Sequence, residues 1–278
     1  MLQRALAVPR APPHRIVLRG PFGAPQDEGG GFLNQTLTTR KEAKMLDHTV
    51  ATREEWLAGR KALLEEEKQF TRARDALGAK RRALPWVRID KPYRFEGAEG
   101  VMTLSDLFGP KRQLIVQHFM FAPEWEKPCK SCSFWADGFN GILAHLAQRD
   151  TAFVAVSRAP LEKLEARKRK MGWSFPWVSS GDGDFNYDFA VSFRDEDIEA
   201  GTATYNYAPK SGTMKDLPGV SAFVKADGAV YHAYSCFARG LDILNPAYNY
   251  LDLTPLGRQE EGLPFPMSWV RLHDEYAA

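Results

Sequence analysis

Residues 113–135 read QLIVQHFMFAPEWEKPCKSCSFW, and they decide how the rest of the chain is interpreted. The first nine, Gln113 to Phe121, are an apolar run of strand length, which is typical of a strand buried in a parallel sheet. After a short loop, the pair Cys129 and Cys132 has the C-x-x-C spacing and opens a helical pattern that continues to about Ala147. The stretch therefore predicts a strand, a loop and a helix, with two cysteines at the start of the helix.

The elements that follow favour an α/β fold with a central mixed sheet flanked by helices. A second apolar strand is expected at 151–157, a basic amphipathic helix at 161–171 and a short strand at 175–178. Residues 221–225 and 229–235 flank a D-G turn, which predicts a β-hairpin. Alternating strands and helices indicate a parallel centre, and the hairpin adds an antiparallel edge.

A long helix is predicted at 52–84, ahead of the sheet. Thr52 and Glu55 have the spacing of a capping box, and Pro85 is expected to end the helix. Every seventh residue is apolar, and the stripe consists of Trp56, Leu63, Phe70, Leu77 and Leu84. A coiled coil needs a second apolar position in each heptad, and in this helix that position is polar or small at most turns. We therefore expect the helix to dock on its own domain, with a homodimer as the less favoured alternative.

The first 44 residues differ in composition from the rest of the chain. They carry seven basic and three acidic side chains and are rich in proline and glycine. Because they show no sustained period of 2 or 3.6, we expect 1–44 to be a disordered basic arm and 45–278 to be one domain. The arm lacks the apolar core of a secretory signal. A transit peptide and an extension without structural role stay open, the extension being favoured, and Met45 could be the functional start.

The composition of the whole chain excludes several classes of protein. The 278 residues include 37 Lys and Arg against 35 Asp and Glu, and 44% are hydrophobic, as in globular proteins. A net charge of +2 argues against broad capture of nucleic acid, and no run of 18 apolar residues predicts a membrane span. Three cysteines are too few for a disulfide-stapled secreted scaffold. We expect a cytoplasmic protein without nucleic-acid or membrane partners.

The C-x-x-C pair has three common uses: half of a zinc site, a redox pair, or a coincidence in the core. Structural zinc requires four ligands, and the remaining candidates, Cys236, His118, His145 and His232, do not have the spacing of ligands. We expect His118 to be a core histidine and Cys236 a packed small residue. The redox use is favoured because active sites of open α/β sheets lie at the carboxyl ends of the strands.

The position of the pair assigns a different role to each cysteine. Cys129 is the expected attacking thiol, because the partial positive charge at a helix N-terminus lowers the pKa of a thiol. Lys127 and Lys130 act in the same direction, although nearby glutamates oppose them. Cys132, one turn later, would resolve the mixed disulfide.

Three polar residues could support this chemistry. Ser131 and Ser133 could donate hydrogen bonds to a thiolate, and Asp137 could accept a proton. For each of them, capping or a solvated surface position is the plainer alternative. We expect no metal ligands and no cofactor.

The stretches QLIVQHFMF, APEWEKPCKSC and SAFVKADGAVYHAYS resemble the thioredoxin superfamily. The resemblance implies a proline, usually cis, that precedes the hairpin and faces the cysteines, and Pro218 is the candidate. Trp125 resembles the loop tryptophan of thioredoxins, although it lies four residues before Cys129 instead of next to it. The residues between the cysteines, Lys130 and Ser131, differ from the Gly-Pro of thioredoxins, so the redox potential does not carry over.

From Met45 onward the chain is similar to an uncharacterised bacterial family, domain of unknown function 899, which is grouped with the thioredoxin-like fold. Matching stretches include TREEWLAGRKALLEEEKQFTR, RRALPWVRIDKPYRF, LIVQHFMFAPEWEKPCKSCSFWADGFNG and GLDILNPAYNYLDLTPLGR. The resemblance implies a thioredoxin-like domain with a long N-terminal helix. Residues 182–217 form an insert before the hairpin that could cover the site, and a last helix is expected at 240–253 with Pro246 as an irregularity.

These observations favour a thiol–disulfide oxidoreductase that acts on a protein or small-molecule thiol or disulfide. Glu126 stands where peroxiredoxins place Thr or Ser, so dithiol exchange is favoured over peroxidase activity. Two alternatives stay open. The cysteines could hold a soft metal such as Cu(I) or Zn, or the protein could be a non-catalytic interaction module whose long helix recruits a partner.

Overall fold

The structure is a computed structural model that describes residues 48–276, and the expected basic arm at 1–44 lies outside them. The helices are α1 (Arg53–Arg82), α2 (Lys130–Ala136), α3 (Phe139–Gln148), α4 (Leu161–Met171), α5 (Phe185–Asp188), α6 (Asp195–Glu199) and α7 (Pro246–Leu251). Short 3-10 turns are η1 (Asp106–Phe108), η2 (Ala238–Leu244) and η3 (His273–Glu275). The strands are β1 (Val87–Arg88), β2 (Arg94–Gly97), β3 (Gly100–Thr103), β4 (Gln113–His118), β5 (Thr151–Ser157), β6 (Trp177–Ser179), β7 (Thr204–Tyr205), β8 (Ala208–Pro209), β9 (Gly219–Ala226) and β10 (Ala229–Phe237).

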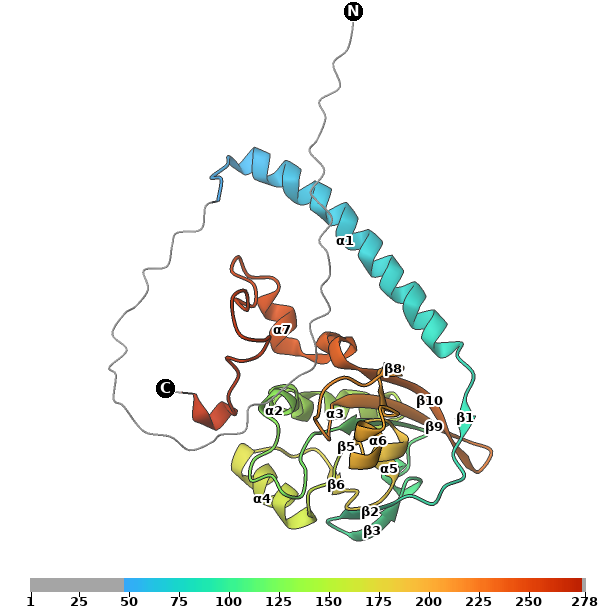
Figure 1. The fold of residues 1–278 in the computed structure, drawn as a ribbon. Helices are drawn as coiled ribbons and strands as arrows, with labels where there is room; N and C mark the ends of the chain where they lie inside the picture. The colour runs from blue at the N-terminus through green and yellow to red at the C-terminus, as the bar shows by residue number, and fades with distance from the viewer. Residues whose placement is uncertain (1–47, 277–278) are drawn as a thin grey trace, which may run out of the picture.

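Eight of the strands form one mixed sheet in the order β1-β10-β9-β4-β5-β6-β2-β3 (Figure 1). The central strands β4, β5 and β6 are parallel, and β9 and β10 add antiparallel strands beside β4. The β9–β10 turn has positive φ at Asp227 and Gly228, as a two-residue hairpin turn requires. The expected thioredoxin-like α/β fold is confirmed by this arrangement of a parallel β4–α2–α3–β5 crossover and an antiparallel hairpin.

Both faces of the sheet are covered, which explains why its central strands read as continuous apolar runs. In β5, Phe153 and Ala155 pack into one hydrophobic cluster, together with residues of α2, α3 and α4. Val154 and Val156 point to the other face, where a second cluster includes residues of β2, η1 and α5. Successive side chains of a strand alternate between the faces, so a strand buried on both sides needs apolar residues at every position.

Two predicted helices are interrupted in the structure. The helix that begins after Cys129 stops at Ala136, and α3 starts at Phe139 after the break at Asp137 and Gly138. The helix expected at 240–253 is divided into η2 and α7. Proline fits the first turn of a helix but not its interior, and Asn245 caps the new start by accepting a hydrogen bond from the Tyr248 N–H at 3.1 Å.

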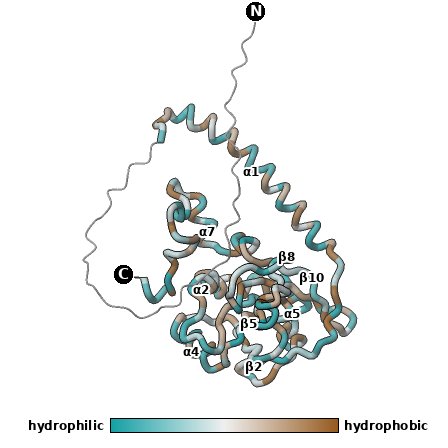
Figure 2. The backbone as a smooth tube through the Cα atoms, in the orientation of Figure 1, coloured by the Kyte–Doolittle hydropathy of each residue, from teal (hydrophilic) through white to brown (hydrophobic). Residues whose placement is uncertain are grey.

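The predicted N-terminal helix is confirmed, but the expectation that it docks on its own domain is wrong. The Thr52 hydroxyl accepts from the Glu55 N–H at 3.2 Å, and the Glu55 carboxylate accepts from the Thr52 N–H at 2.9 Å. The helix ends at Arg82, ahead of Pro85. No residue of α1 is buried, and the helix extends away from the sheet (Figure 1). Its hydrophobic positions, brown in Figure 2, are therefore interspersed along a solvent-exposed helix.

Candidate functional site

The C-x-x-C pair lies past the carboxyl end of β4, where the sequence placed it. Cys129 is the N-cap residue of α2, and its N–H donates to the carbonyl of Met120 at 3.0 Å. Its side chain is partly exposed, whereas Cys132, in the first turn of α2, is 5% exposed. All three cysteines of the chain are free thiols. The pair thus combines one partly exposed cysteine with one buried cysteine.

The two thiols have pKa values shifted in opposite directions. The pKa of Cys129 is lowered to about 7, chiefly by a hydrogen bond from the Cys132 thiol, with further bonds from the backbone N–H groups of Cys132 and Ser131 and from the Ser131 side chain. Burial opposes this shift. The pKa of Cys132 is raised, chiefly because its thiol donates to Cys129, and also by burial. Cys129 is therefore the sulfur that ionises first.

The loop between β4 and Cys129 is held by a lysine of α4. Lys163 Nζ donates to the carbonyl of Pro123 at 2.6 Å and to the carbonyl of Trp125 at 3.1 Å. The Trp125 side chain is partly buried against the cluster of α2, α3 and α4. The predicted loop tryptophan thus belongs to the wall beside the cysteines.

The flanking lysines are engaged by the C-terminal segment. Lys127 forms an ion pair with Glu275 at 2.8 Å. Lys130 Nζ donates to the carbonyl of Ser268 at 3.1 Å, and burial lowers its pKa. Hydrogen bonds at the helix start, more than these two charges, therefore account for the lowered pKa of Cys129.

The other supporting residues have distinct surroundings. The Ser131 hydroxyl and N–H contribute to the lowered pKa of Cys129. The Ser133 hydroxyl instead donates to the Cys129 carbonyl at 3.0 Å. The Asp137 carboxylate accepts from the Trp173 indole at 2.9 Å and lies 2.6 Å from His273 Nδ1. Ser133 and Asp137 thus have hydrogen-bond partners other than the Cys129 thiol.

Pro218 lies directly before β9, beside the carboxyl end of β4. Gly219 pairs with His118 across the two strands, and the Pro218 carbonyl accepts from the Tyr205 hydroxyl at 2.8 Å. All peptide bonds within residues 48–276, including the bond before Pro218, are trans. The cis geometry usual in thioredoxins is therefore not present here.

Sequence reasoning missed a buried acidic group whose charge acts on Cys132. Asp216, 5% exposed, accepts a hydrogen bond from Ser192 Oγ and lies 3.4 Å from Arg158 Nη1. Burial raises the pKa of Asp216, and its carboxylate contributes to the raised pKa of Cys132. The sequence offered only two weak signals for this pair: Arg158 directly follows a buried strand, and Asp216 lies two residues before Pro218. The insert therefore supplies a buried carboxylate that pairs with Arg158 after β5 and acts on the pKa of Cys132.

His118 and His232 belong to a chain of hydrogen-bonded polar side chains. Cys236 lines a groove that does not include the cysteine pair. His118 is 1% exposed, as a core histidine should be, and its Nε2 lies 2.8 Å from Ser221 Oγ. Ser221 Oγ lies 2.7 Å from Ser235 Oγ, which lies 2.7 Å from His232 Nε2. Burial lowers the pKa of His118 to about 3. This chain of four side chains crosses β4, β9 and β10.

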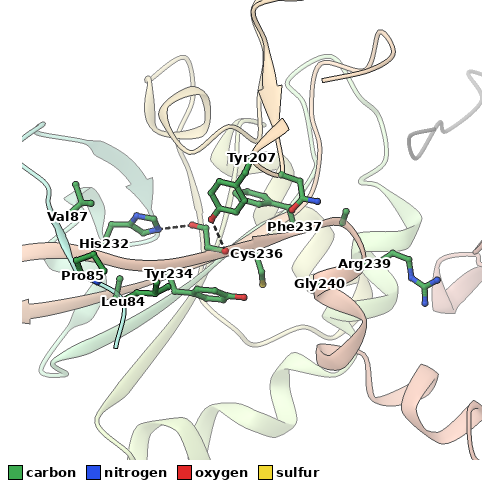
Figure 3. A pocket seen from close by; sticks show the side chains of 14 residues that line it. Leu84, Pro85, Val87, Tyr207, His232, Tyr234, Cys236, Phe237, Arg239 and Gly240 are labelled. Carbon is green, nitrogen blue, oxygen red and sulfur yellow. Dashed lines mark hydrogen bonds between the residues drawn. The ribbon is translucent and has the colours of Figure 1, made fainter. Parts of the chain in front are cut away.

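Cys236 faces a groove of about 720 Å³ at the outer edge of β10 (Figure 3). Tyr207 and Phe237 pack edge-on there, with ring centroids 5.6 Å apart, and Leu84 and Pro85 border the opposite side. Cys236 is packed against the core cluster, as expected of a packed small residue, and is partly buried. Neither Cys129 nor Cys132 lines this groove.

Two wider properties concern residues 48–276. No three His, Cys, Asp or Glu side chains in this part of the chain come together as metal ligands would. None of its helices is long and apolar enough to cross a membrane.

Comparisons with known proteins support the family and give distant structural neighbours. A family model described as "Bacterial protein of unknown function (DUF899)" matches residues 45–276. No curated protein matches the chain. A mutant of peroxiredoxin Q from Xanthomonas campestris is 16% identical, with 60% of this chain and 98% of that chain covered, at a TM-score of 0.41.

Two further solved structures are similarly distant. Peroxidoxin BcpB from Mycobacterium tuberculosis is 14% identical, with coverage of 56% of this chain and 85% of that chain and a TM-score of 0.39. A mutant of PrxQ from Xylella fastidiosa is 16% identical, covering 56% and 88%, at a TM-score of 0.37. The fold assignment rests on the strand order and register described above.

Proposed function

The chain belongs to the bacterial family DUF899, and we propose that it is a thiol–disulfide oxidoreductase that uses Cys129 and Cys132. The observation that carries this proposal is the placement of the pair past the carboxyl end of β4, with Cys129 as the partly exposed N-cap residue of α2 and Cys132 buried in its first turn. The opposite shifts of the two thiol pKa values support it. A lowered pKa provides thiolate, which is the nucleophile in disulfide exchange. The partner is a protein or small-molecule disulfide.

The first step is attack by Cys129, the partly exposed cysteine of the pair. The Cys129 thiolate attacks one sulfur of the partner disulfide, a mixed disulfide forms, and the other partner sulfur leaves as a thiolate that takes up a proton from water. A pKa of about 7 leaves roughly half of Cys129 ionised at neutral pH. The position of Cys129 as the N-cap residue of α2 places it at the start of the helix, where the partial positive charge favours the thiolate.

The second step follows from a change in the surroundings of Cys132. Its pKa is raised mainly by its bond to the Cys129 thiolate, and the charge of that thiolate adds to the effect. Both causes disappear once Cys129 is bonded to the partner sulfur. Cys132 then loses its proton more readily, attacks Cys129 Sγ and releases the second partner thiolate. The protein dithiol is oxidised by two electrons, and the partner disulfide is reduced to two thiols.

Three single variants test these roles on the full chain. Reduced protein is mixed with a chromogenic aromatic disulfide, and the released thiol is measured. Cys129→Ser should abolish the fast exchange, and Cys132→Ser should release one thiol equivalent and retain a stable mixed disulfide on Cys129. Cys236→Ser, outside the pair, is the matched control and should behave as the unsubstituted protein. Unchanged exchange by Cys129→Ser would contradict the proposal.

The soft-metal alternative is distinguished by the metal content of protein purified without chelators. About one Cu or Zn per chain, lost in Cys129→Ser and accompanied by no thiol exchange, would replace the redox proposal with metal binding. Metal-free protein that exchanges thiols supports the redox role.

A further inference from the structure

The long helix α1 presents an apolar stripe that its own domain does not cover. Trp56, Leu63, Phe70, Leu77 and Leu84 are between 46% and 69% exposed. Its four helical members, Trp56 to Leu77, span about 32 Å of α1 at 1.5 Å per residue, and Leu84 lies two residues past the end of the helix. Leu57 and Leu64 widen its N-terminal half.

A helix of this kind gains most of its stability by packing its apolar face against another element. Contiguous exposed apolar patches on soluble proteins mark interaction surfaces. We propose that α1 pairs with α1 of a second copy of this chain, antiparallel and around a twofold axis at Phe70. The proposal concerns a surface remote from the cysteine pair and does not depend on the proposed function.

The spacing of the stripe is symmetric about Phe70. Leu63 and Leu77 lie seven residues on either side of it, and Trp56 and Leu84 lie fourteen residues on either side. In an antiparallel pair centred there, Phe70 meets its own copy, Leu63 meets Leu77 of the second copy, and Trp56 meets Leu84 of the second copy. Every large residue of the stripe is then opposed by another.

Charges beside the stripe favour the antiparallel over the parallel pair. In an antiparallel pair, each helix contacts the other along the same side of its stripe, and Glu67 and Arg74 lie on one side. Glu67 of each copy therefore faces Arg74 of the other copy. In a parallel pair, one side of the stripe on one helix contacts the other side of the stripe on the second helix. Glu67 would then face Glu66, and Arg81 would face Lys80, so both contacts would join like charges.

The antiparallel register also brings Arg60 towards Arg81 of the second copy at each end of the pair. Both guanidinium groups have partners within their own chain. Arg60 Nη2 lies 2.7 Å from the Glu67 carboxylate, and the Arg81 guanidinium lies 5.5 Å from the centroid of the Tyr234 ring. These contacts reduce the repulsion at the ends.

The groove at the edge of β10 extends the same surface. Leu84, the last residue of the stripe, also lines this groove of about 720 Å³, together with Val87, Tyr207 and Phe237 (Figure 3). The proposed register places Trp56 of the second copy at Leu84, beside the groove. Helix and groove together can supply the roughly 20–30 residues a side of a stable interface.

Cross-linking of single-cysteine variants tests both the pair and its direction. In a background with all three native cysteines replaced by serine, Phe70→Cys should form an intermolecular disulfide with itself. Leu63→Cys and Leu77→Cys should not cross-link alone but should cross-link to each other when mixed, because a disulfide needs Cα atoms about 4.4–6.8 Å apart. Self-cross-linking of all three variants would indicate a parallel pair and overturn the proposal.

Sedimentation of the unsubstituted chain in reducing buffer provides a measurement without substitutions. A mass near twice 31.3 kDa is expected. Phe70→Glu should shift the protein to the monomer mass, whereas Gln69→Glu, which adds the same charge beside the stripe, should leave a dimer. A monomer at high micromolar concentration would overturn the proposal and assign the stripe to a different partner.

Discussion

Replacing Cys132 by alanine should raise the pKa of Cys129 from about 7 towards its ordinary value of 9.0. The largest cause of the lowered pKa is the hydrogen bond from the Cys132 thiol, and alanine removes this donor. The backbone N–H groups at the start of α2 stay in place. The substitution therefore isolates the side-chain hydrogen bond from the position of Cys129 at the helix N-terminus.

The expected change in reactivity follows from two opposing effects. At pH 7, a rise of two pKa units lowers the thiolate fraction from about one half to about one in a hundred. The less acidic thiolate is a better nucleophile, by roughly eightfold for a Brønsted coefficient of about 0.45. Alkylation of Cys129 at pH 7 should therefore be slower in Cys132→Ala, by up to about sixfold if the pKa rises by the full two units. Above about pH 8 the order should reverse, because enough Cys129 is then ionised in Cys132→Ala for its more nucleophilic thiolate to react faster.

The assay is the rate of iodoacetamide alkylation of Cys129 against pH, read by mass spectrometry in a Cys236→Ser background. Cys132→Ser is the matched control, because its hydroxyl keeps a donor at the same place and should keep the pKa low. An unchanged pKa of about 7 in Cys132→Ala would refute the assigned hydrogen bond. Equal pKa values in the alanine and serine variants would do the same.

Three further changes test the fold around the site by chemical unfolding. Buried His118 stays neutral down to about pH 3, whereas its unfolded form takes up a proton below 6.5. Stability should therefore fall by about 2 kcal/mol between pH 6.5 and about pH 5, and His118→Gln should lack this part of the loss. Lys163→Met removes two hydrogen bonds to loop carbonyls and should cost about 1–3 kcal/mol, whereas Lys170→Met removes one exposed ion pair and should cost about 0–1 kcal/mol. Gly219→Ala places a methyl group 2.9 Å from two buried side chains and should cost about 1–3 kcal/mol, whereas Gly141→Ala, in open space on a helix, should stabilise by about 0.5–1 kcal/mol. Equal effects within either pair, or equal pH slopes for His118→Gln and the unsubstituted protein, would contradict these assignments.

The sequence predicted the parts of the fold whose signals are local. The strand at 151–157 and the helix at 161–171 have the predicted bounds, because each has a complete apolar pattern and clear ends. Cys129 at the start of a helix followed from the same kind of signal. The predicted stripe of α1 is present, but amphipathicity shows only that a face needs a partner and does not show which one.

The parts that sequence reasoning missed depend on contacts between distant segments. The pairs Lys127 with Glu275 and Lys130 with Ser268 join residues more than a hundred positions apart. Asp216 is polar in sequence and surrounded by no helical or strand pattern, yet the fold buries it near Cys132. No local pattern predicts such contacts, because they arise only when the insert and the C-terminal segment pack onto the sheet.

The central claim is that Cys129 and Cys132 interconvert between a dithiol and a disulfide. A titration of the full chain in buffers of defined thiol–disulfide ratio, with the state of each cysteine read by peptide mass mapping, tests it most directly. The expected result is a Cys129–Cys132 disulfide that forms and is reduced reversibly in one two-electron transition, tenfold per about 30 mV, while Cys236 remains a thiol. Failure of this disulfide to form at any potential, with Cys236 oxidised instead, would contradict the claim.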